Sequence, residues 1–342
     1  MSEESPSSLL RALPSGFRIL LALVIALFLC GFFIRLAGQD PLIAGKALIA
    51  GALGSSARRA ESLSKTIPLI MTGLSVAIAF RAGFFNVGAE GQFLMGALVA
   101  AGLGTKAGLP MPLILCGGTV AGAIWALVAG WLKMRRGAPE IITTIMLNYI
   151  ALQIVAFAVG DQGPLQEAER TQPQTDLLPL RAQLPALIPN TNLHAGLFIA
   201  LLCALVCWWL LFRTERGFLM RAVGANPLAS RAAGIRVESN VQRAVALCGA
   251  LSGLGGAMEV AGSTKYLGQG GFGYGYTAIA VALLGGLNPL GVLPAALLFG
   301  MLDAGGKAME RDANVPAVTV SIVIGIVIFV MAAIPKLRLQ VQ

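Results

Sequence analysis

The stretch FRAGFFNVGAEGQFLMGALVAAG, residues 80–102, is apolar over most of its length, yet polar side chains gather near its start. These side chains are Arg81, Asn86, Glu90 and Gln92, and three glycines, at positions 83, 88 and 91, separate them. A charged group within a membrane segment costs about 2.5–3.5 kcal/mol and marks a candidate functional site. Glycine lets the backbone bend where other residues cannot. The stretch therefore predicts an interrupted membrane helix that carries polar groups at the interruption.

Two interpretations of this interruption stay open. In the first, the freed backbone groups and the amides of Asn86 and Gln92 face a polar pathway, and Glu90 pairs with Arg81. In the second, Arg81 and Glu90 mark a cytoplasmic hairpin between two spans. The rest of the chain decides what kind of protein carries the stretch.

The composition is that of a membrane protein. Of 342 residues, 56% are hydrophobic and only 12% are charged, and the mean hydropathy is +0.79. A soluble domain has about a quarter charged residues. Long continuous apolar runs favour helices over a β-barrel, whose strands alternate. We therefore predict an all-α polytopic fold. The net charge of +9 fits basic loops on the cytoplasmic side, and no basic stretch interleaves with aromatic residues as in nucleic-acid binding.

About ten transmembrane helices are predicted, and residues 1–342 form one transmembrane domain. The eighth segment is short, so it is tilted, broken or re-entrant. Residues 38–65 and 161–193 are long outer (periplasmic) connections, and residues 213–240 form a cytoplasmic loop. Basic clusters after the fourth and sixth segments predict cytoplasmic N- and C-termini. The ten segments are approximately 18–37, 66–82, 84–105, 111–132, 139–160, 194–213, 241–262, 274–287, 289–308 and 316–335.

A weak internal repeat relates the two halves. GAPEIITTIMLNYIA (137–151) resembles NVPAVTVSIVIGIVI (314–328), and GFFNVGAEGQ from Gly83 resembles GFGYGYTAIA from Gly271. Five segments separate the copies, so the copies, about 66–160 and 241–335, point in opposite directions. Inverted repeats are typical of transporters, whose substrate path lies at broken helices. Chance similarity between apolar segments is the alternative.

Motifs for nucleotide binding and catalysis are missing from the sequence. No GxxxxGK[ST] occurs, and the GxGxxG match in GQGGFG (268–273) lies outside any βαβ unit. The five cysteines lie in apolar runs without a cluster of histidines, so no metal site is expected. An intramembrane enzyme is therefore a weak hypothesis.

Further polar and aromatic residues are candidates to line a substrate path. Asn148 and Tyr149 lie in the span APEIITTIMLNYIALQ, and Tyr274 and Tyr276 lie in the second glycine-rich run. Asn148 either joins helices or contacts substrate, and the tyrosines either anchor at the membrane interface or stack on a flat ring. The full set of pathway candidates is Phe84, Asn86, Glu90, Gln92, Asn148, Tyr149, Tyr274 and Tyr276.

The cytoplasmic loop contains helix-capping signals. Asn226 suits an N-cap, Pro227 the first helical position and Gly234 the stop. They predict a short helix, about 227–233, that lies outside the membrane and that a partner protein grips. Ala229 and Arg231 lie on it. An ordinary surface helix is the alternative. Elsewhere, the glycine pairs 118/122 and 249/253 permit close helix packing.

Four blocks of the chain resemble the permease subunits of ATP-binding-cassette importers for nucleosides and simple sugars. The blocks are GFFNVGAEGQFLMGA, PEIITTIMLNYIA, RAVGANPLASRAAGI and GYGYTAIAVALLGGLNP, and they span most of residues 66–335. PEIITTIMLNYIA is similar to the nucleoside branch, and RAVGANPLASRAAGI resembles the loop whose short helix docks on the ATPase.

The resemblance implies a ten-helix inverted-repeat fold in the bacterial cytoplasmic membrane. It also implies a second permease, identical or different, two cytoplasmic ATPase subunits that hold ATP and Mg, and an external binding protein or lipoprotein. Nucleoside import is the resulting hypothesis, with simple-sugar import as the alternative. A stand-alone secondary transporter is a further alternative, for which Glu90, Glu259 and Asp303 are the candidate proton-relay groups.

Overall fold

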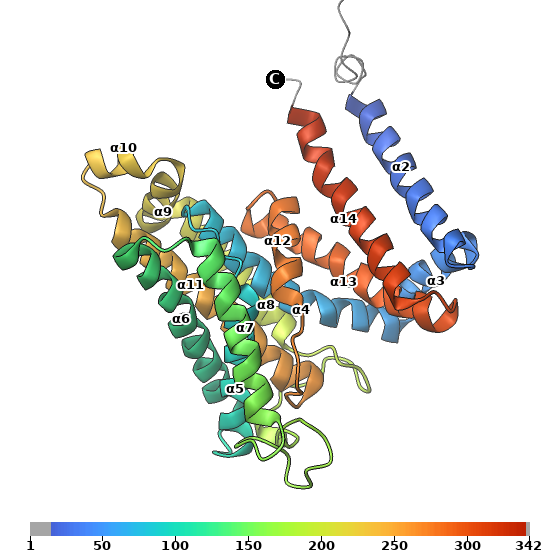
Figure 1. Cartoon of the computed structure of the whole chain (residues 1–342), viewed down its shortest axis with the longest axis horizontal. Coiled ribbons are helices and arrows are strands. Elements are labelled where there is room, and N and C mark those ends of the chain that lie inside the picture. The colour runs from blue at the N-terminus through green and yellow to red at the C-terminus, as the bar shows by residue number, and fades with distance from the viewer. Residues whose placement is uncertain (1–14, 340–342) are drawn as a thin grey trace, which may run out of the picture. The chain divides into compact units, whose positions relative to one another are not determined.

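The computed structural model describes residues 15–339, and helices account for most of them (Figure 1). Between residues 15 and 339 there is no strand, only isolated bridges, which confirms the all-α prediction. In chain order the helices are α2 (Ser15–Leu36), α3 (Pro41–Leu53), α4 (Ser56–Arg81), α5 (Ala89–Thr105), α6 (Met111–Arg136), α7 (Glu140–Val159), the 3-10 turn η1 (Leu180–Ala182), α8 (Gly196–Arg213), α9 (Glu215–Ala225), α10 (Pro227–Ala232), α11 (Val237–Met258), the π-helix η2 (Glu259–Thr264), α12 (Tyr274–Leu284), α13 (Pro289–Asp312) and α14 (Ala317–Leu339).

The chain is polytopic, but about ten spans is too high a number. In the described part of the chain, six helices are long and apolar enough to cross a membrane. They become seven when Val24–Leu36 and Pro41–Leu53, which meet at 110°, count as one broken span. Each predicted segment falls on a helix, but α5 has 17 residues and α12 only 11. A straight crossing needs about 20 residues, so α12 cannot make one.

Most of residues 38–65, predicted as a long connection, are helical and belong to α3 and the first turns of α4. Asp40 is the N-cap of α3, and its carboxylate accepts hydrogen bonds from the amides of Leu42 and Ile43 at 2.7 and 3.4 Å. Pro41 occupies the first helical position, where its missing N–H has no cost. The small residues of this connection lie in α3 and in the first turns of α4.

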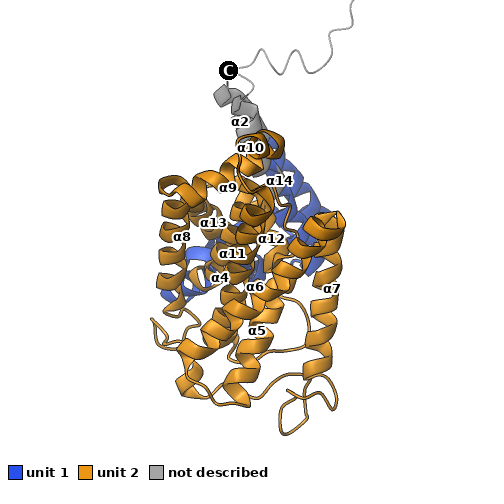
Figure 2. Ribbon diagram, turned by 90° about the vertical axis from the view of Figure 1, so that its left-hand side faces the viewer, with its two compact units in different colours: residues 1–62, 301–342 blue, residues 63–300 orange. Residues whose placement is uncertain are grey.

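The chain divides into two compact units, residues 1–62 with 301–342 and residues 63–300 (Figure 2). Residues 1–14 and 340–342 of the first unit lie outside the described part. The described part of the first unit has a core of buried apolar residues, including Cys30, Met309 and Val323. Arg58 and Asp312 form an ion pair of 2.9 Å within this unit.

The second unit is built around α5, α6 and α11, which pack on one another through glycines. A Cβ on Gly122 of α6 would lie 2.3 Å from the carbonyl oxygen of Gly249 on α11. A Cβ on Gly253 would lie 2.3 Å from the carbonyl oxygen of Gly118. No side chain fits at such distances, so the predicted close approach of the two glycine pairs is confirmed.

The order of elements repeats along the chain. In the first copy α4 is followed by an irregular segment and then α5, α6 and α7. In the second, α11 with η2 is followed by an irregular segment and then α12, α13 and α14. Each irregular segment contains a glycine with positive φ, +75° at Gly83 and +77° at Gly273. This order agrees with the predicted repeat, and the opposite direction of the copies stays a prediction.

Residues 213–240 hold two helices before α11 rather than a loop with one. The amide of Ala229 donates to the Asn226 side chain at 3.0 Å, so Asn226 caps α10. At the other end Gly234 has φ +79°, and the amide of Ile235 donates to the carbonyl of Ser230 at 2.9 Å. This pattern is a Schellman stop. The helix Pro227–Ala232 thus forms within the predicted range of 227–233. Helix α9 precedes it, and its N-cap is Thr214.

Candidate functional site

Residues 82–88, called the elbow below, join α4 to α5, and the buried side chain of Asn86 in the elbow pairs with Gln92 of α5. Asn86 Nδ2 donates to Gln92 Oε1 at 3.1 Å, and Gln92 Nε2 donates to Asn86 Oδ1 at 2.9 Å. The amide of Gly88 also donates to Asn86 Oδ1, at 3.0 Å. Both side chains are at most 2% exposed. Because buried polar groups must be hydrogen-bonded, this pairing lets the two amide side chains lie in the protein interior.

The carboxylate of Glu90 binds the start of α12. Its Oε1 accepts from the amides of Phe272 at 2.8 Å and Gly273 at 2.7 Å, and its Oε2 accepts from Gly275 at 2.7 Å. Glu90 also lies in the first turn of its own helix, α5. The N-terminus of a helix carries partial positive charge, so an anion is stabilised there. Glu90 lies at two such N-termini, those of α5 and α12. This explains how its carboxylate is tolerated although the residue is only 2% exposed.

Arg81 binds the opposite end of α12. It does not pair with Glu90, which the first interpretation of the interruption had suggested. Its Nε donates to the carbonyl of Leu287 at 2.6 Å, and its Nη2 donates to the carbonyl of Gly286 at 3.2 Å. These carbonyls follow the last residue of α12, Leu284. The C-terminal end of a helix attracts cations. Arg81 and Glu90 therefore bind opposite ends of α12, each at the end that suits its charge.

Asn148 joins α7 to the elbow and to α5. Its Oδ1 accepts from the amide of Gly91 at 2.8 Å, and its Nδ2 donates to the carbonyl of Val87 at 3.0 Å. The same Nδ2 lies 3.5 Å from the hydroxyl of Tyr276 on α12. Asn148 thus connects helices, one of the two roles considered for it, and it also lies beside a cavity.

A cavity of about 240 Å³ lies between α5, α7 and the start of α12. Four predicted pathway residues meet there: Glu90, Asn148, Tyr149 and Tyr276. The tyrosine side chains are 57% and 48% exposed, so flat rings are available to a ligand beside the polar groups. Ligand sites combine apolar and aromatic walls with a few placed polar groups. The remaining lining residues are Leu94, Leu152, Gly271 and Gly273.

The other four pathway candidates lie in the protein interior, away from this cavity's lining. Asn86 and Gln92 bind each other, as described above. Phe84 is fully buried, with the Lys133 ammonium 5.2 Å from its ring centre. Tyr274 is buried, stacks on Phe272, and accepts a hydrogen bond from Lys65 at 3.0 Å. These residues support the walls of the region.

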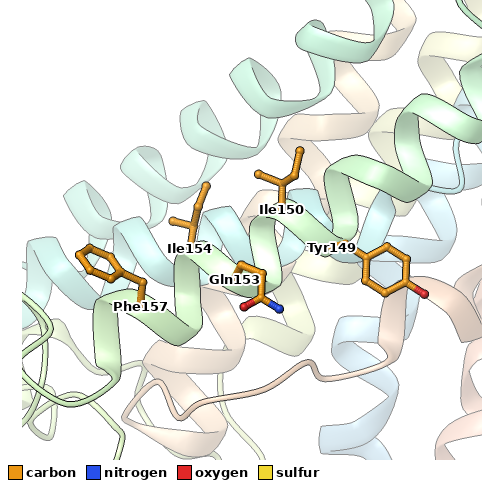
Figure 3. Close-up of a pocket in the computed structure, with 5 residues that line it drawn as sticks. All are labelled: Tyr149, Ile150, Gln153, Ile154 and Phe157. Atoms are coloured by element: carbon orange, nitrogen blue, oxygen red, sulfur yellow. The ribbon is translucent and has the colours of Figure 1, made fainter.

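Tyr149 also belongs to a shallow hollow of about 390 Å³ along the outer face of α7 (Figure 3). Ile150, Gln153, Ile154 and Phe157 complete it. Apart from the Gln153 amide and the Tyr149 hydroxyl, this face is apolar, as suits a helix side that meets lipid or another membrane helix.

The loop 161–193 is hydrogen-bonded to the segment that leads into α12. The amides of Thr175 and Leu178 donate to the carbonyls of Leu267 and Lys265, each at 2.9 Å. Within the loop, Glu167 accepts from Thr171, Gln174 and Gln172. These hydrogen bonds lower the pKa of Glu167 to about 2. The loop is thus ordered by its own contacts and attached next to the cavity.

The sole histidine is a buried structural residue. His194 is 1% exposed, and its Nδ1 accepts from the amide of Gly196 at 3.2 Å. Its Nε2 lies 3.4 Å from the hydroxyl of Ser263, which also donates to Glu259 at 3.1 Å. Glu259 is therefore hydrogen-bonded within η2, and Glu90 is hydrogen-bonded to the start of α12. The Asp303 carboxylate lies 3.9 Å from the Lys307 ammonium. Each candidate relay carboxylate has local partners of its own.

Two features of the site were not predicted from the sequence. The first is the attachment of Arg81 to α12. The second is the set of further residues that line the cavity: Leu94, Leu152, Gly271 and Gly273. Glycines 271 and 273 lie in a run already singled out, and that run was the available signal. The apolar residues Leu94 and Leu152 carry no such signal.

Residues 59–332 match the model of a family described as "Branched-chain amino acid transport system / permease component". The chain belongs to this family of transport permeases.

Among curated proteins, the chain is 36% identical to the guanosine ABC transporter permease protein NupP of Bacillus subtilis, over 93% of each chain. It is also 36% identical to the nucleoside ABC transporter permease protein NupB of Lactococcus lactis, over 89% of this chain and 87% of that one. The glucose ABC transporter permease protein TsgB13 of Haloferax volcanii is 34% identical over 90% of this chain and 84% of its own. No solved structure matches the chain.

Proposed function

We propose that this chain is the permease subunit of an ATP-binding-cassette importer and that it passes nucleosides through the membrane. The observation that carries the proposal is the cavity between α5, α7 and α12, where two accessible tyrosine rings lie beside an amide and a carboxylate. Flat rings stack on a nucleobase, and the tyrosine hydroxyls can donate and accept hydrogen bonds to base and ribose. Relatives named for guanosine and nucleosides support the same substrate class.

The work of transport comes from partners. We propose that two ATPase subunits, which hold ATP and Mg, dock on α10 and α9 at the cytoplasmic side. The chain itself is proposed to carry no ATP site and no metal. A second permease and an external binding protein or lipoprotein complete the assembly, in the bacterial cytoplasmic membrane with both termini of this chain inside. The exposed apolar side chains Leu228 on α10 and Phe218 on α9 support a docking role for this region.

Simple-sugar import is the second candidate, which the glucose relative supports. The two substrates differ in the flat ring of the base, which a sugar lacks. Two accessible tyrosine rings favour the nucleoside, because stacking contributes only where a planar partner is present.

The test is uptake by the complete transporter in proteoliposomes that contain ATP. Radiolabelled guanosine should enter, and a tenfold excess of unlabelled glucose should not slow its entry. Glucose uptake without guanosine uptake would overturn the nucleoside proposal. Uptake of either by the chain alone, driven by a proton gradient without ATPase subunits, would overturn the importer mechanism.

A further inference from the structure

Helix α12 is bound at both of its ends by residues that flank the elbow. Arg81 is the last residue of α4, and Glu90 is the second residue of α5. With 11 residues, α12 is about 16 Å long. Glu90 binds the amides at its start and Arg81 the carbonyls after its end, at the distances given above. The two residues that flank the elbow are therefore attached to opposite ends of the short helix.

The backbones of α12 and α5 are in close contact at the start of α12. A Cβ on Gly275 would lie 2.1 Å from the amide nitrogen of Glu90, so the backbones of α12 and α5 touch directly. Hydrogen bonds from backbone amides to a carboxylate are about twice as strong as neutral ones. Three of them converge on Glu90 in a buried place, where an unmade bond is costly. Glu90 is thus the stronger of the two attachments.

The elbow is also in contact with the cytoplasmic helix α9. A Cβ on Gly224 would lie 2.0 Å from the carbonyl oxygen of Arg81, and a Cβ on Gly83 would lie 3.1 Å from Gly224 Cα. In addition, the guanidinium groups of Arg81 and Arg221 lie over the ring of Phe212, at 5.2 and 5.1 Å. Helix α9, which precedes α10, therefore contacts the same elbow whose flanking residues bind α12.

We propose that Arg81 and Glu90 are positioning residues that attach α12 to the elbow, so that a displacement of α9 moves the wall of the cavity. The path runs from α9 through Gly224 to the elbow, and from the elbow through the two charged side chains to α12, which carries Tyr276. This inference rests on the proposed function, because it assigns the cavity of that proposal a mechanical link to the ATPase side.

The first experiment is chemical rescue in the complete transporter, reconstituted in proteoliposomes. Glu90→Ala should import at least about tenfold less guanosine per ATP hydrolysed than the wild type, because three charge-assisted bonds are lost. Millimolar formate reaches the vacated position through the cavity that Glu90 lines, and should restore uptake. Chloride at the same concentration should not. Arg81→Ala should respond to methylguanidinium and not to formate.

Several outcomes overturn the proposal. Full uptake by Glu90→Ala without formate overturns it, and so does restoration of uptake equally by chloride and formate. Because the alanine variant risks misfolding, Glu90→Gln is the second variant. The amide keeps the size of the side chain and turns a donor group toward the backbone donors. Wild-type coupling of hydrolysis to uptake in Glu90→Gln would also overturn the proposal.

A second pair of variants tests the contact with α9. Gly224→Ala should separate α9 from the elbow and lower uptake per ATP hydrolysed by at least about fivefold, since its Cβ has no space. Gly45→Ala is the matched control, because a Cβ there meets no atom within 4 Å. An equal effect of both variants, or none of Gly224→Ala, contradicts the proposed path.

The attachment can be tested without any substrate. The thermal unfolding midpoint of purified Glu90→Ala chain in detergent should rise with formate, while that of the wild type should not. If the wild-type transporter imports no guanosine, the proposed function fails, and this measurement still decides whether Glu90 occupies an anion position. A flat response of the Glu90→Ala midpoint to formate overturns the attachment alone.

Discussion

Asn148 of α7 and Gly91 of α5 are joined by a hydrogen bond of 2.8 Å from the backbone amide of Gly91 to the side-chain oxygen. A Cβ on Gly91 would lie 2.9 Å from this oxygen, so glycine is required for the bond to form. The result is a direct connection between the cavity wall and the first turn of α5.

Replacing Asn148 by leucine should destabilise the chain. The change leaves the amide of Gly91 and the carbonyl of Val87 without their partner, and a buried unsatisfied group costs about 1–3 kcal/mol. We expect a lower thermal unfolding midpoint in detergent and loss of guanosine uptake. Gln153→Leu on the exposed face of the same helix is the control. Equal midpoints for the two variants would contradict the role of Asn148.

Helix α10 should lose its proposed ATPase partner when its exposed apolar side chain becomes charged. Leu228 is 77% exposed, and an exposed leucine on a short capped helix suits insertion into a partner's pocket. We expect Leu228→Asp to reduce co-purification of the ATPase subunits at least about tenfold, since a few buried anchors carry most binding energy. The control is Leu180→Asp in the loop 161–193, at 86% exposure. ATPase retention by Leu228→Asp would remove the docking role from α10.

Substitution of Gly122 by valine should disrupt the packing of α6 on α11. A Cβ at this position would lie 2.3 Å from the carbonyl of Gly249, so one of the helices must shift. Overpacking of this kind costs about 1–3 kcal/mol. The unfolding midpoint of the purified chain measures it, with Gly45→Ala as the control. An unchanged midpoint would mean that the two helices separate freely.

The order of the loop 161–193 should depend on the charge of Glu167. Its pKa is lowered to about 2 by hydrogen bonds from Thr171 and Gln174 and from the amide of Gln172. A depressed carboxyl pKa stabilises the fold above the ordinary value of about 4.5, and the effect is lost as the pH falls toward 2. The protection factors for hydrogen exchange at Thr171 and Gln172 should therefore stay high at pH 5 and fall below pH 4. Glu167→Gln should speed exchange already at pH 7, whereas Glu169→Gln should not.

Features set by neighbouring residues could be predicted from the sequence. Asn226, Pro227 and Gly234 are caps of one helix, and each acts within a turn or so of itself, so the position of α10 follows from local rules. The glycine pairs of α6 and α11 were visible for a similar reason. Their spacing places them on one side of each helix, whatever the partner is.

Features that depend on distant partners could not be predicted. Glu90 and Phe272 are 182 positions apart, and nothing in either stretch names the other. Arg81 was the nearest opposite charge and hence the plausible partner, but the backbone ends of α12 offered both residues better sites. The same limit applies to Asn86 and Tyr274. Polarity indicated that they were special, and only the fold distinguishes an internal bond from a cavity wall.

The number of spans was overestimated because hydropathy counts apolar residues and not the direction of the helix. Residues 274–287 are as apolar as a membrane span, but α12 ends at Leu284, where Gly285 and Gly286 begin a turn. A helix of 11 residues still meets its hydrogen-bonding needs in an apolar environment, because Glu90 and Arg81 satisfy its ends.

The mutual pairing of Asn86 and Gln92 has a consequence for how these two positions evolve. Each amide donates to the other and accepts from it, so a chain that loses one of them keeps a buried amide that lacks this partner. The double replacement Asn86→Leu with Gln92→Leu should therefore be milder than the sum of the two single ones. Over evolutionary time the two positions should change as a single trait, and chains that keep only one amide should be rare among descendants.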